Sequence, residues 1–236
     1  MPRPRINLIA NKSSGARNIV NALRALGAET TRSSRRLEGA FNIGWGRPGG
    51  DLNPRIPPNK LWELQTCRRA GVQTVPFVQN FLQADGQEGT WLGRLIHHTK
   101  GRDIVLHRPG EPAPRRDFWT RLINKSAEYR IHVFQGLAVR SGTKLPEPDA
   151  DRGIIWNLDN RYLLHYEYPA PRAAKDLAKA AVAACGLDFA AVDVLQDMNG
   201  ILYVLELNTA PGLHGNTTQK YAEKILAAAK RRQGNE

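Results

Sequence analysis

The sequence of 236 residues predicts an α+β fold in which antiparallel strands dominate the second half. Three observations favour this class. The chain opens with a short apolar run, a polar turn and an amphipathic helix; short β-branched segments separated by turns follow; and an amphipathic helix comes last. With 41% hydrophobic residues and no visible internal repeat, the chain is long enough to bury a sizeable core.

The first third is expected to combine strands and helices. Short apolar runs bounded by Gly and Pro predict strands, and apolar residues spaced by three and four predict helices. The expected elements are a strand over 5–10, a helix over 16–26 that Gly27 ends, a strand over 40–45, a helix over 60–70 and a strand over 72–78. The Gly- and Pro-rich segment 46–59 is expected to be a loop or domain joint.

The rest of the chain is expected to consist mainly of strands. These are predicted over 91–97, 103–107, 117–123, 129–134, 137–140, 154–156 and 162–166. Residues 141–153 are predicted to form a long loop. Helices are expected over 173–185, which Gly186 ends, and over 219–232, after a predicted hairpin.

Composition places the chain among cytoplasmic proteins. No apolar run reaches the length of a membrane span, and the N-terminus has only a five-residue apolar patch, too short for a secretory signal. Cys67 and Cys185 belong to no zinc or C-x-x-C pattern, which favours two reduced thiols. We therefore expect a cytoplasmic protein without a membrane partner.

The net charge of +12 indicates an anionic ligand or partner. Clustered Lys and Arg bind phosphate backbones, so a nucleic acid is one interpretation. However, the basic groups are scattered along the chain, and no RNA-binding signature accompanies them. A nucleotide, an anionic substrate or an acidic partner explains the charge equally well.

A hairpin is predicted around Asn199-Gly200, which separates two β-branched apolar runs. This dipeptide favours a two-residue type I′ turn, because both residues tolerate positive φ. Met198 would then pair with Ile201. Counting along both arms places Asp193 opposite Glu206, on a face that also carries Ala191, Leu195, Leu202 and Val204.

The hairpin is a candidate metal site. Asn208 lies two residues beyond Glu206 and therefore on the same face as the facing carboxylates of Asp193 and Glu206. Like charges that face each other destabilise a ribbon unless something neutralises them, and oxygen ligands of this kind suit Mg²⁺. A solvent-exposed acidic face is the alternative, with Asn208 merely starting a turn.

Phosphate-binding candidates precede the hairpin. Lys60 begins a predicted helix, where an amine and the positive helix terminus can share one anion. Arg94 lies on a predicted strand that leads into a turn with Thr99, Lys100 and Gly101, as a loop folding over a triphosphate would do. Taken alone, Lys60 also fits a surface charge, and the loop also fits a polar hairpin.

Other candidates lie further along the chain. Arg130 and His132 fall on one face of a predicted strand, where an Arg can stabilise charge that develops on a transferred phosphoryl or acyl group. A salt bridge to a nearby acid is the alternative for Arg130. Lys144 and Asn157, in and beside the predicted long loop, are candidate substrate contacts.

Taken in order, these motifs resemble the ATP-grasp superfamily, particularly carboxylate-amine ligases such as D-alanine-D-alanine ligase and the RimK-like ligases. NKLWELQTCRRAGVQTVPF is similar to the opening of the ATP-binding region, WLGRLIHHTKGRDIVL to the strands and loop that close over the triphosphate, and FWTRLI to the hinge that receives adenine. EYRIHVFQGLAV resembles the strand with the D/E-x-R motif. AVDVL…YVLELNTAPGL is the most specific match, and the resemblance spans about residues 59 to 213.

The resemblance implies roles and boundaries. ATP contacts would come from Lys60, Arg94, Thr99, Lys100, Gly101, Arg121, Leu122 and Ile123, a catalytic contact from Arg130, and Mg²⁺ ligands from Asp193, Glu206 and Asn208. The implied fold has two α+β lobes that grip ATP. Its domains are a reduced N-terminal β-α domain over 1–57, a small lobe with the closing loop over 58–116 and a C-terminal lobe with the metal site over 117–236.

The implied activity is ligation of a carboxylate to an amine through an acyl phosphate, with release of ADP and phosphate. ATP and Mg²⁺ are the implied cofactors, and the basic charge suits a peptide or protein tail as acceptor. Two departures stand out, because the family usually has Lys where Arg94 stands and more Gly in the closing loop. The alternative is an inactive ATP-grasp relative whose basic surface binds nucleic acid or an acidic partner.

Overall fold

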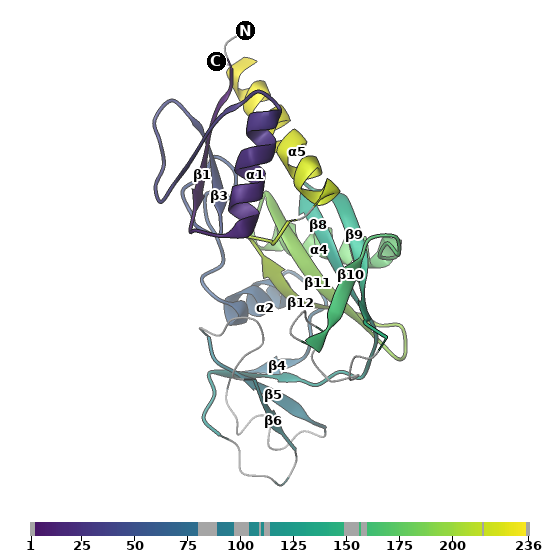
Figure 1. Cartoon of the computed structure of the whole chain (residues 1–236). Coiled ribbons are helices and arrows are strands. Elements are labelled where there is room, and N and C mark those ends of the chain that lie inside the picture. Colours follow the sequence, from purple (N-terminus) through teal and green to yellow (C-terminus); the bar gives the residue numbers. More distant parts are fainter. Residues whose placement is uncertain are drawn as a thin grey trace.

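The computed structural model describes residues 3–79, 89–96, 104–108, 110, 114–148, 156, 160–213 and 215–234. Its elements build three sheets that follow one another along the molecule (Figure 1). The strands are β1 (Arg5–Ala10), β2 (Glu29–Ser33), β3 (Phe41–Trp45), β4 (Phe77–Val78), β5 (Trp91–Arg94), β6 (Val105–His107), β7 (Phe118–Arg121), β8 (Lys125–Phe134), β9 (Leu137–Pro146), β10 (Tyr162–His165), β11 (Phe189–Asp197) and β12 (Leu202–Asn208). The helices are α1 (Ser14–Ala25), α2 (Lys60–Arg69), α4 (Arg172–Ala184) and α5 (Asn216–Gly234). None of these helices is long and apolar enough to cross a bilayer.

The N-terminal sheet is parallel, with the order β2-β1-β3. Helices α1 and α5 pack against each other beside it, so both chain ends lie at the same end of the molecule (Figure 1). Trp45 from β3 contacts Phe189 from β11 and Tyr221 from α5, with ring centroids 5.4 and 5.8 Å away. The N-terminal sheet therefore shares its core with the sheet that follows.

The central sheet is antiparallel, with the order β10-β9-β8-β11-β12. Side chains alternate between its two faces. One face is apolar and packs on α4, where Ile131, Val133, Val192 and Val194 meet the small Ala side chains of the helix. The opposite face carries most of the charged side chains of β8, β9, β11 and β12 and lies toward the third sheet.

The third sheet, with the order β4-β7-β5-β6, forms the lower end of the molecule (Figure 1). Phe77 and Phe118 of this sheet share an apolar cluster with Leu61 of α2 and with Leu195 and Tyr203 of the central sheet. The cluster joins the third sheet to the central sheet at the edge of its charged face.

Several expected elements are confirmed, while one strand was missed and three predictions need correction. Strand β2 was not predicted, because ETTRS is polar and half exposed as an edge strand of the sheet. The predicted loop over 141–153 begins as strand, since β9 continues to Pro146 through its pairing with β10. Trp156 is not in a strand, and only Phe77–Val78 of the segment 72–78 forms one.

Candidate active site

The β11–β12 hairpin brings Asp193 opposite Glu206, as predicted, but by a different route. The turn has three residues, 198–200, closed by a 2.9 Å hydrogen bond from the Asp197 amide to the Ile201 carbonyl oxygen. Gly200 has a φ of +83°, which suits the last position of such a turn. A β-bulge at Leu205 then restores the register. Val194 pairs with Val204 and Asp193 pairs with Glu206, so Leu205 is the extra residue on β12 between these two pairs.

The bulge also corrects the predicted face. Residues on the turn side of Leu205 are shifted by one position, so Leu202 and Val204 turn toward α4 rather than toward Asp193. Ala191 and Leu195 stay on the face of Asp193, as expected. The candidate site is therefore bordered by Leu195, Tyr203 and Leu205 on the side of the third sheet.

Asp193 accepts hydrogen bonds from two cations. Arg130 donates from Nε to Oδ1 at 2.7 Å and from Nη2 to Oδ2 at 2.8 Å, and Lys144 donates from Nζ to Oδ2 at 2.8 Å. Only 6% of the Asp193 side chain is exposed. Burial alone would raise the pKa of Asp193, but Arg130 and Lys144 hold it well below its usual range, so the carboxylate is ionised. Arg130 therefore forms a salt bridge, which was the alternative interpretation of this residue, and its partner Asp193 is a predicted metal ligand.

Glu206 contacts Lys60, whose ammonium donates to Oε2. Asn59 caps α2 by accepting the Trp62 amide at 2.9 Å, which makes Lys60 the first residue of the helix. Burial opposes ionisation of Glu206, but the charge and hydrogen bond of Lys60, together with the charge of Lys144, lower its pKa. Both side chains remain about a quarter exposed, so this pair is more accessible to a ligand than Asp193.

Glu128 was not predicted, although it is the acid of the EYR motif. Its Oε1 accepts from Lys144, and its Oε2 accepts from Lys125 at 2.6 Å. Burial would lower the pKa of Lys144, but Asp193 and Glu128 raise it. The signal was present in the sequence, since Glu128 lies two residues before Arg130 and so on the same face of β8.

Arg94 lies on a strand, as predicted, and is the last residue of β5. Its Nε donates to the Thr120 hydroxyl at 3.0 Å. Burial lowers the pKa of Arg94, while the charges of Glu206 and Glu128 act in the opposite direction. The third sheet thus directs a cation toward the acids of the central sheet. Of the other predicted ATP and substrate contacts, Thr99, Lys100, Gly101 and Asn157 lie outside the described residues.

The predicted hinge, Arg121 to Ile123, begins at the last residue of β7 and continues beyond the strand. The Arg121 amide donates to the Pro76 carbonyl oxygen and the Leu122 amide to that of Thr90, both at 2.8 Å. Adenine would therefore have to contact the carbonyl groups of this segment or the Ile123 amide. Ile123 packs on the apolar cluster between the two sheets, which is a suitable surface for a flat base.

The third predicted metal ligand, Asn208, ends β12. Its Oδ1 accepts the Ala210 amide at 2.9 Å and leaves further acceptor capacity. Glu63 of α2 holds the neighbouring residue, because its Oε2 accepts the Leu207 amide at 3.1 Å. Burial raises the pKa of Glu63 to about 8, so this side chain is protonated at neutral pH.

His132 lies on the face of Arg130, as predicted, and is fully buried. Its Nδ1 is 3.2 Å from the Tyr221 hydroxyl and its Nε2 is 3.1 Å from the Tyr166 hydroxyl. Burial and the nearby Arg130 lower its pKa to about 3. His132 is therefore neutral and carries no charge to the site.

The donor set fits a hard divalent cation. Asp193, Glu206 and Asn208 offer two carboxylates and an amide from adjacent strands, which are the oxygen ligands that Mg²⁺ accepts together with phosphate and water. Within the described ranges, no group of three His, Cys, Asp or Glu side chains is placed to hold a metal by itself. A cation here would depend on Asn208 and on oxygens of a bound ligand.

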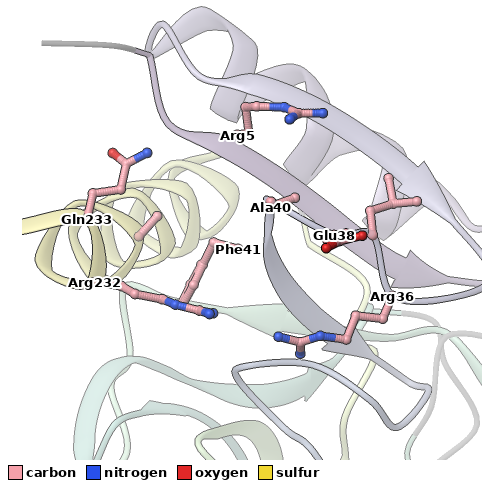
Figure 2. A pocket seen from close by; sticks show the side chains of 10 residues that line it. Arg5, Arg36, Glu38, Ala40, Phe41, Arg232 and Gln233 are labelled. Atoms are coloured by element: carbon pink, nitrogen blue, oxygen red, sulfur yellow. The ribbon is translucent and has the colours of Figure 1, made fainter. Parts of the chain in front are cut away.

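A cavity of about 280 Å³ lies elsewhere, between the N-terminal sheet and the end of α5 (Figure 2). Two of its arginines are engaged with one carboxylate, since Arg36 and Arg232 each lie 2.6 Å from Asp51. Arg5 and Glu38 complete its charged lining. The cavity contains no member of the charge cluster on the central sheet, which consists of the ion-paired side chains Lys60, Lys125, Glu128, Arg130, Lys144, Asp193 and Glu206.

The chain has the ATP-grasp fold. No family model and no curated protein matches the sequence. Among solved structures, the ATP-grasp ligase PsnB complexed with a phosphomimetic variant of its minimal precursor, Mg and ADP is similar, with a TM-score of 0.70 and 11% identity over 96% of this chain and 99% of that chain. D-alanine-D-alanine ligase from Bacillus anthracis complexed with ATP has a TM-score of 0.69 and 13% identity over 100% and 99%. The macrocyclase MdnC from Microcystis aeruginosa, bound with its precursor peptide MdnA, has a TM-score of 0.61 and 12% identity over 96% and 100%.

Proposed function

We propose that this protein is an ATP- and Mg²⁺-dependent ligase that activates a carboxylate as an acyl phosphate and passes the acyl group to an amine, releasing ADP and phosphate. The ATP-grasp fold supports the general reaction type, because the similar structures include ligases that hold ATP, or ADP with Mg. The charge cluster on the central sheet supports the use of a phosphorylated nucleotide.

The observation that carries the proposal is the convergence of acids and bases from separate elements. Asp193 and Glu206 face each other on β11 and β12, and their cationic partners come from α2, β8 and β9. Salt bridges that serve only to stabilise a fold seldom form a buried cluster of this size, since the desolvation of each charge offsets much of the attraction between the charges. A site that receives a triphosphate needs such cations, because it must neutralise several negative charges.

Each side chain has a role in this reaction. Lys60, Arg94 and Arg130 would bind phosphate oxygens and offset the charge that develops as the phosphoryl group moves. Asp193, Glu206 and Asn208 would hold the metal. Mg²⁺ would supply charge neutralisation between phosphate oxygens when bound. No side chain is needed as a nucleophile, because the substrate carboxylate attacks phosphorus and the amine then attacks the acyl carbon.

The cations are held at defined positions before any ligand enters. Arg130 is fixed by its double hydrogen bond to Asp193, and Lys144 is shared between Asp193 and Glu128. Preorganised charges of this kind stabilise a transition state without reorganising during the reaction. Lys60 and Glu206 are the more exposed pair, so we expect entry of metal and nucleotide to separate them first.

The acceptor is proposed to be an acidic peptide or protein tail. PsnB and MdnC were each solved with a precursor peptide, and the net charge of +12 on this chain favours an anionic partner. Lys144, predicted as a substrate contact, is buried in the charge cluster, so its proposed role is to position Asp193 and Glu128. Asn157 stays a prediction.

Calorimetric titration of a non-hydrolysable ATP analogue with Mg²⁺ tests the proposal. We expect the native chain to bind and Glu206→Gln to lose at least about 100-fold in affinity, because the variant keeps the shape but lacks the charge of a metal ligand. The partly exposed Lys60–Glu206 pair contributes little to stability, so the variant should unfold within about 1 kcal/mol of the native chain.

Glu223→Gln is the matched control, since Glu223 is exposed on α5 and its carboxylate accepts a hydrogen bond from the Gln219 side chain at 3.0 Å. It should bind the analogue like the native chain. Equal binding by Glu206→Gln would refute the metal assignment. Failure of the native chain to bind would favour the alternative of a basic binding protein, whose affinity for nucleic acid would fall steeply with salt.

A further inference from the structure

A second arginine on the charged face of the central sheet differs from Arg130 in its surroundings. Arg140 on β9 pairs with His132 on β8, and Gly142 on β9 pairs with Arg130 on β8. These two pairs are two positions apart along the strands, so the Arg140 side chain is on the same face of the sheet as Arg130. Arg130 and Lys144 each contact Asp193. Arg140, by contrast, forms no ion pair with any carboxylate in the described part of the chain.

The Arg140 guanidinium also has an unused donor. Its Nε is buried and lacks a hydrogen-bond partner among the described residues. A buried donor on a charged group that stays unpaired is unfavourable, and most such groups in folded proteins are satisfied. The side chain is half-buried, so a ligand can still approach it. An anion is the ligand that would satisfy both the charge and the donor.

The position of Arg140 is fixed by a chain of aromatic contacts. Its guanidinium carbon lies 4.0 Å from the centroid of the Tyr166 ring. The Tyr166 hydroxyl is 3.1 Å from His132 Nε2, and the Tyr221 hydroxyl is 3.2 Å from His132 Nδ1. Because Tyr221 and His132 are fully buried, this chain anchors Tyr166 to the core. The guanidinium is thus preorganised rather than a mobile surface charge.

Gly142 explains how Tyr166 reaches this position. A Cβ atom on Gly142 would lie 2.8 Å from the His165 carbonyl oxygen and 3.1 Å from its carbonyl carbon. The absence of a side chain therefore lets the chain leaving β10 pass close to β9, directly before Tyr166. Any larger residue would push this segment away from the charged face.

We propose that Arg140, on its Tyr166 platform, binds a substrate carboxylate that the ligation leaves intact. This inference rests on the proposed function and names its substrate class: a molecule with a second carboxylate besides the one that reacts. A planar guanidinium suits a carboxylate, which it can bind through two parallel hydrogen bonds. The reacting carboxylate is a poorer candidate, because neutralising it would weaken its attack on phosphorus.

The second carboxylate has two sources with the same chemistry, a small free diacid or an acidic side chain of a peptide. Titration calorimetry without nucleotide separates them, with glutarate and hexaglutamate as probes and butyrate as the monocarboxylate control. We expect one or both diacid probes to bind the native chain. Arg140→Gln should weaken that binding at least about tenfold, which is the usual effect of one charge-assisted hydrogen-bonded pair.

Two further variants keep the inference falsifiable. Arg172→Gln removes an arginine that is 96% exposed at the start of α4, and it should bind like the native chain. Tyr166→Leu keeps Arg140 but removes its platform, so it should weaken binding even if Arg140→Gln fails to fold. Binding of glutarate alone would identify a small diacid, and binding of hexaglutamate alone would identify an acidic peptide.

Equal binding of the probes by the native chain, Arg140→Gln and Tyr166→Leu would overturn the inference, and so would a native chain that binds neither probe. The ATP-analogue titration reports separately on the proposed function. If the native chain binds the analogue but no diacid, the ligase proposal stands and the Arg140 site is wrong. If diacid binding depends on Arg140 but the analogue does not bind, the carboxylate site stands and the ligase proposal is wrong.

Discussion

Replacing Asp193 with Asn tests whether the charge cluster is a buried network or a collection of surface pairs. The carboxylate accepts three hydrogen bonds from Arg130 and Lys144 at 2.7 to 2.8 Å, and its side chain is 6% exposed. The Asp193→Asn substitution would keep the volume but leave the buried Lys144 and the partly buried Arg130 facing a neutral amide. One end of that amide is a donor and would point its hydrogens at a cation.

The expected loss of stability follows from this geometry. Breaking a buried ion pair by neutralising one partner costs about 3–5 kcal/mol, because the other partner stays desolvated and uncompensated. For a chain of this length, each kcal/mol shifts the melting temperature by roughly 2–4 °C. Asp193→Asn should therefore melt roughly 6–20 °C below the native chain. Differential scanning calorimetry at pH 7 and low salt measures this shift.

Asp176→Asn is the matched control. Asp176 also contacts a Lys and an Arg, at 2.6 and 3.7 Å, but its side chain is 50% exposed on α4. Exposed pairs of this kind contribute about 0–1 kcal/mol, so its melting temperature should fall by at most a few degrees. Equal shifts in the two variants would refute the conclusion that burial makes the Asp193 network different.

Two further predictions concern residues beside the site. Burial raises the pKa of Glu63 to about 8, so the folded state holds a proton that the unfolded state releases near the usual pKa of a glutamate. The contribution of Glu63 to the free energy of unfolding therefore falls as the pH rises toward 8, by at most about 1.4 kcal/mol per pH unit. Glu63→Gln keeps an acceptor for Leu207 and should gain stability relative to the native chain between pH 5 and 8 in urea unfolding; a constant difference across this range would contradict the protonated assignment. Gly142→Ala should lower stability by about 1–3 kcal/mol, because the added Cβ atom would lie 2.8 Å from the His165 carbonyl oxygen. The same variant should weaken diacid binding in the calorimetric assay. Native-like stability and binding would show that the segment after β10 moves without consequence.

The hairpin shows what a pattern of residue types can predict. The pairing of Asp193 with Glu206 was predicted from a two-residue turn, yet the turn has three residues and a bulge at Leu205 compensates for the extra one. Asn199-Gly200 is compatible with both turns, since each needs positive φ at Gly200. A bulge leaves little trace in a sequence, so the faces of Leu202 and Val204 were predicted wrongly while the acids were placed correctly.

Residues far apart in the sequence were harder to assign. Lys60, Arg94 and Arg130 were selected by residue type and position, and the structure places their charges near the same acids. Glu128 was overlooked, although period-two alternation places it beside Arg130. The partnership of Arg140 with Tyr166 depends on the chain passing close to Gly142, which is a tertiary contact that local patterns do not contain.

The packing of α1 against α5 has a consequence for the order of folding during synthesis. The Asn18 side chain donates from Nδ2 to the Leu213 carbonyl oxygen, 195 positions later, and Trp45 packs on Tyr221. A ribosome would release β1, α1 and β3 long before their partners emerge, so the first elements made cannot bury their apolar side chains until nearly all of the described chain has been translated. Long-range contacts of this kind slow folding and prolong the exposure of apolar surface. We therefore expect nascent chains that stop before α5 to bind chaperones through the N-terminal sheet.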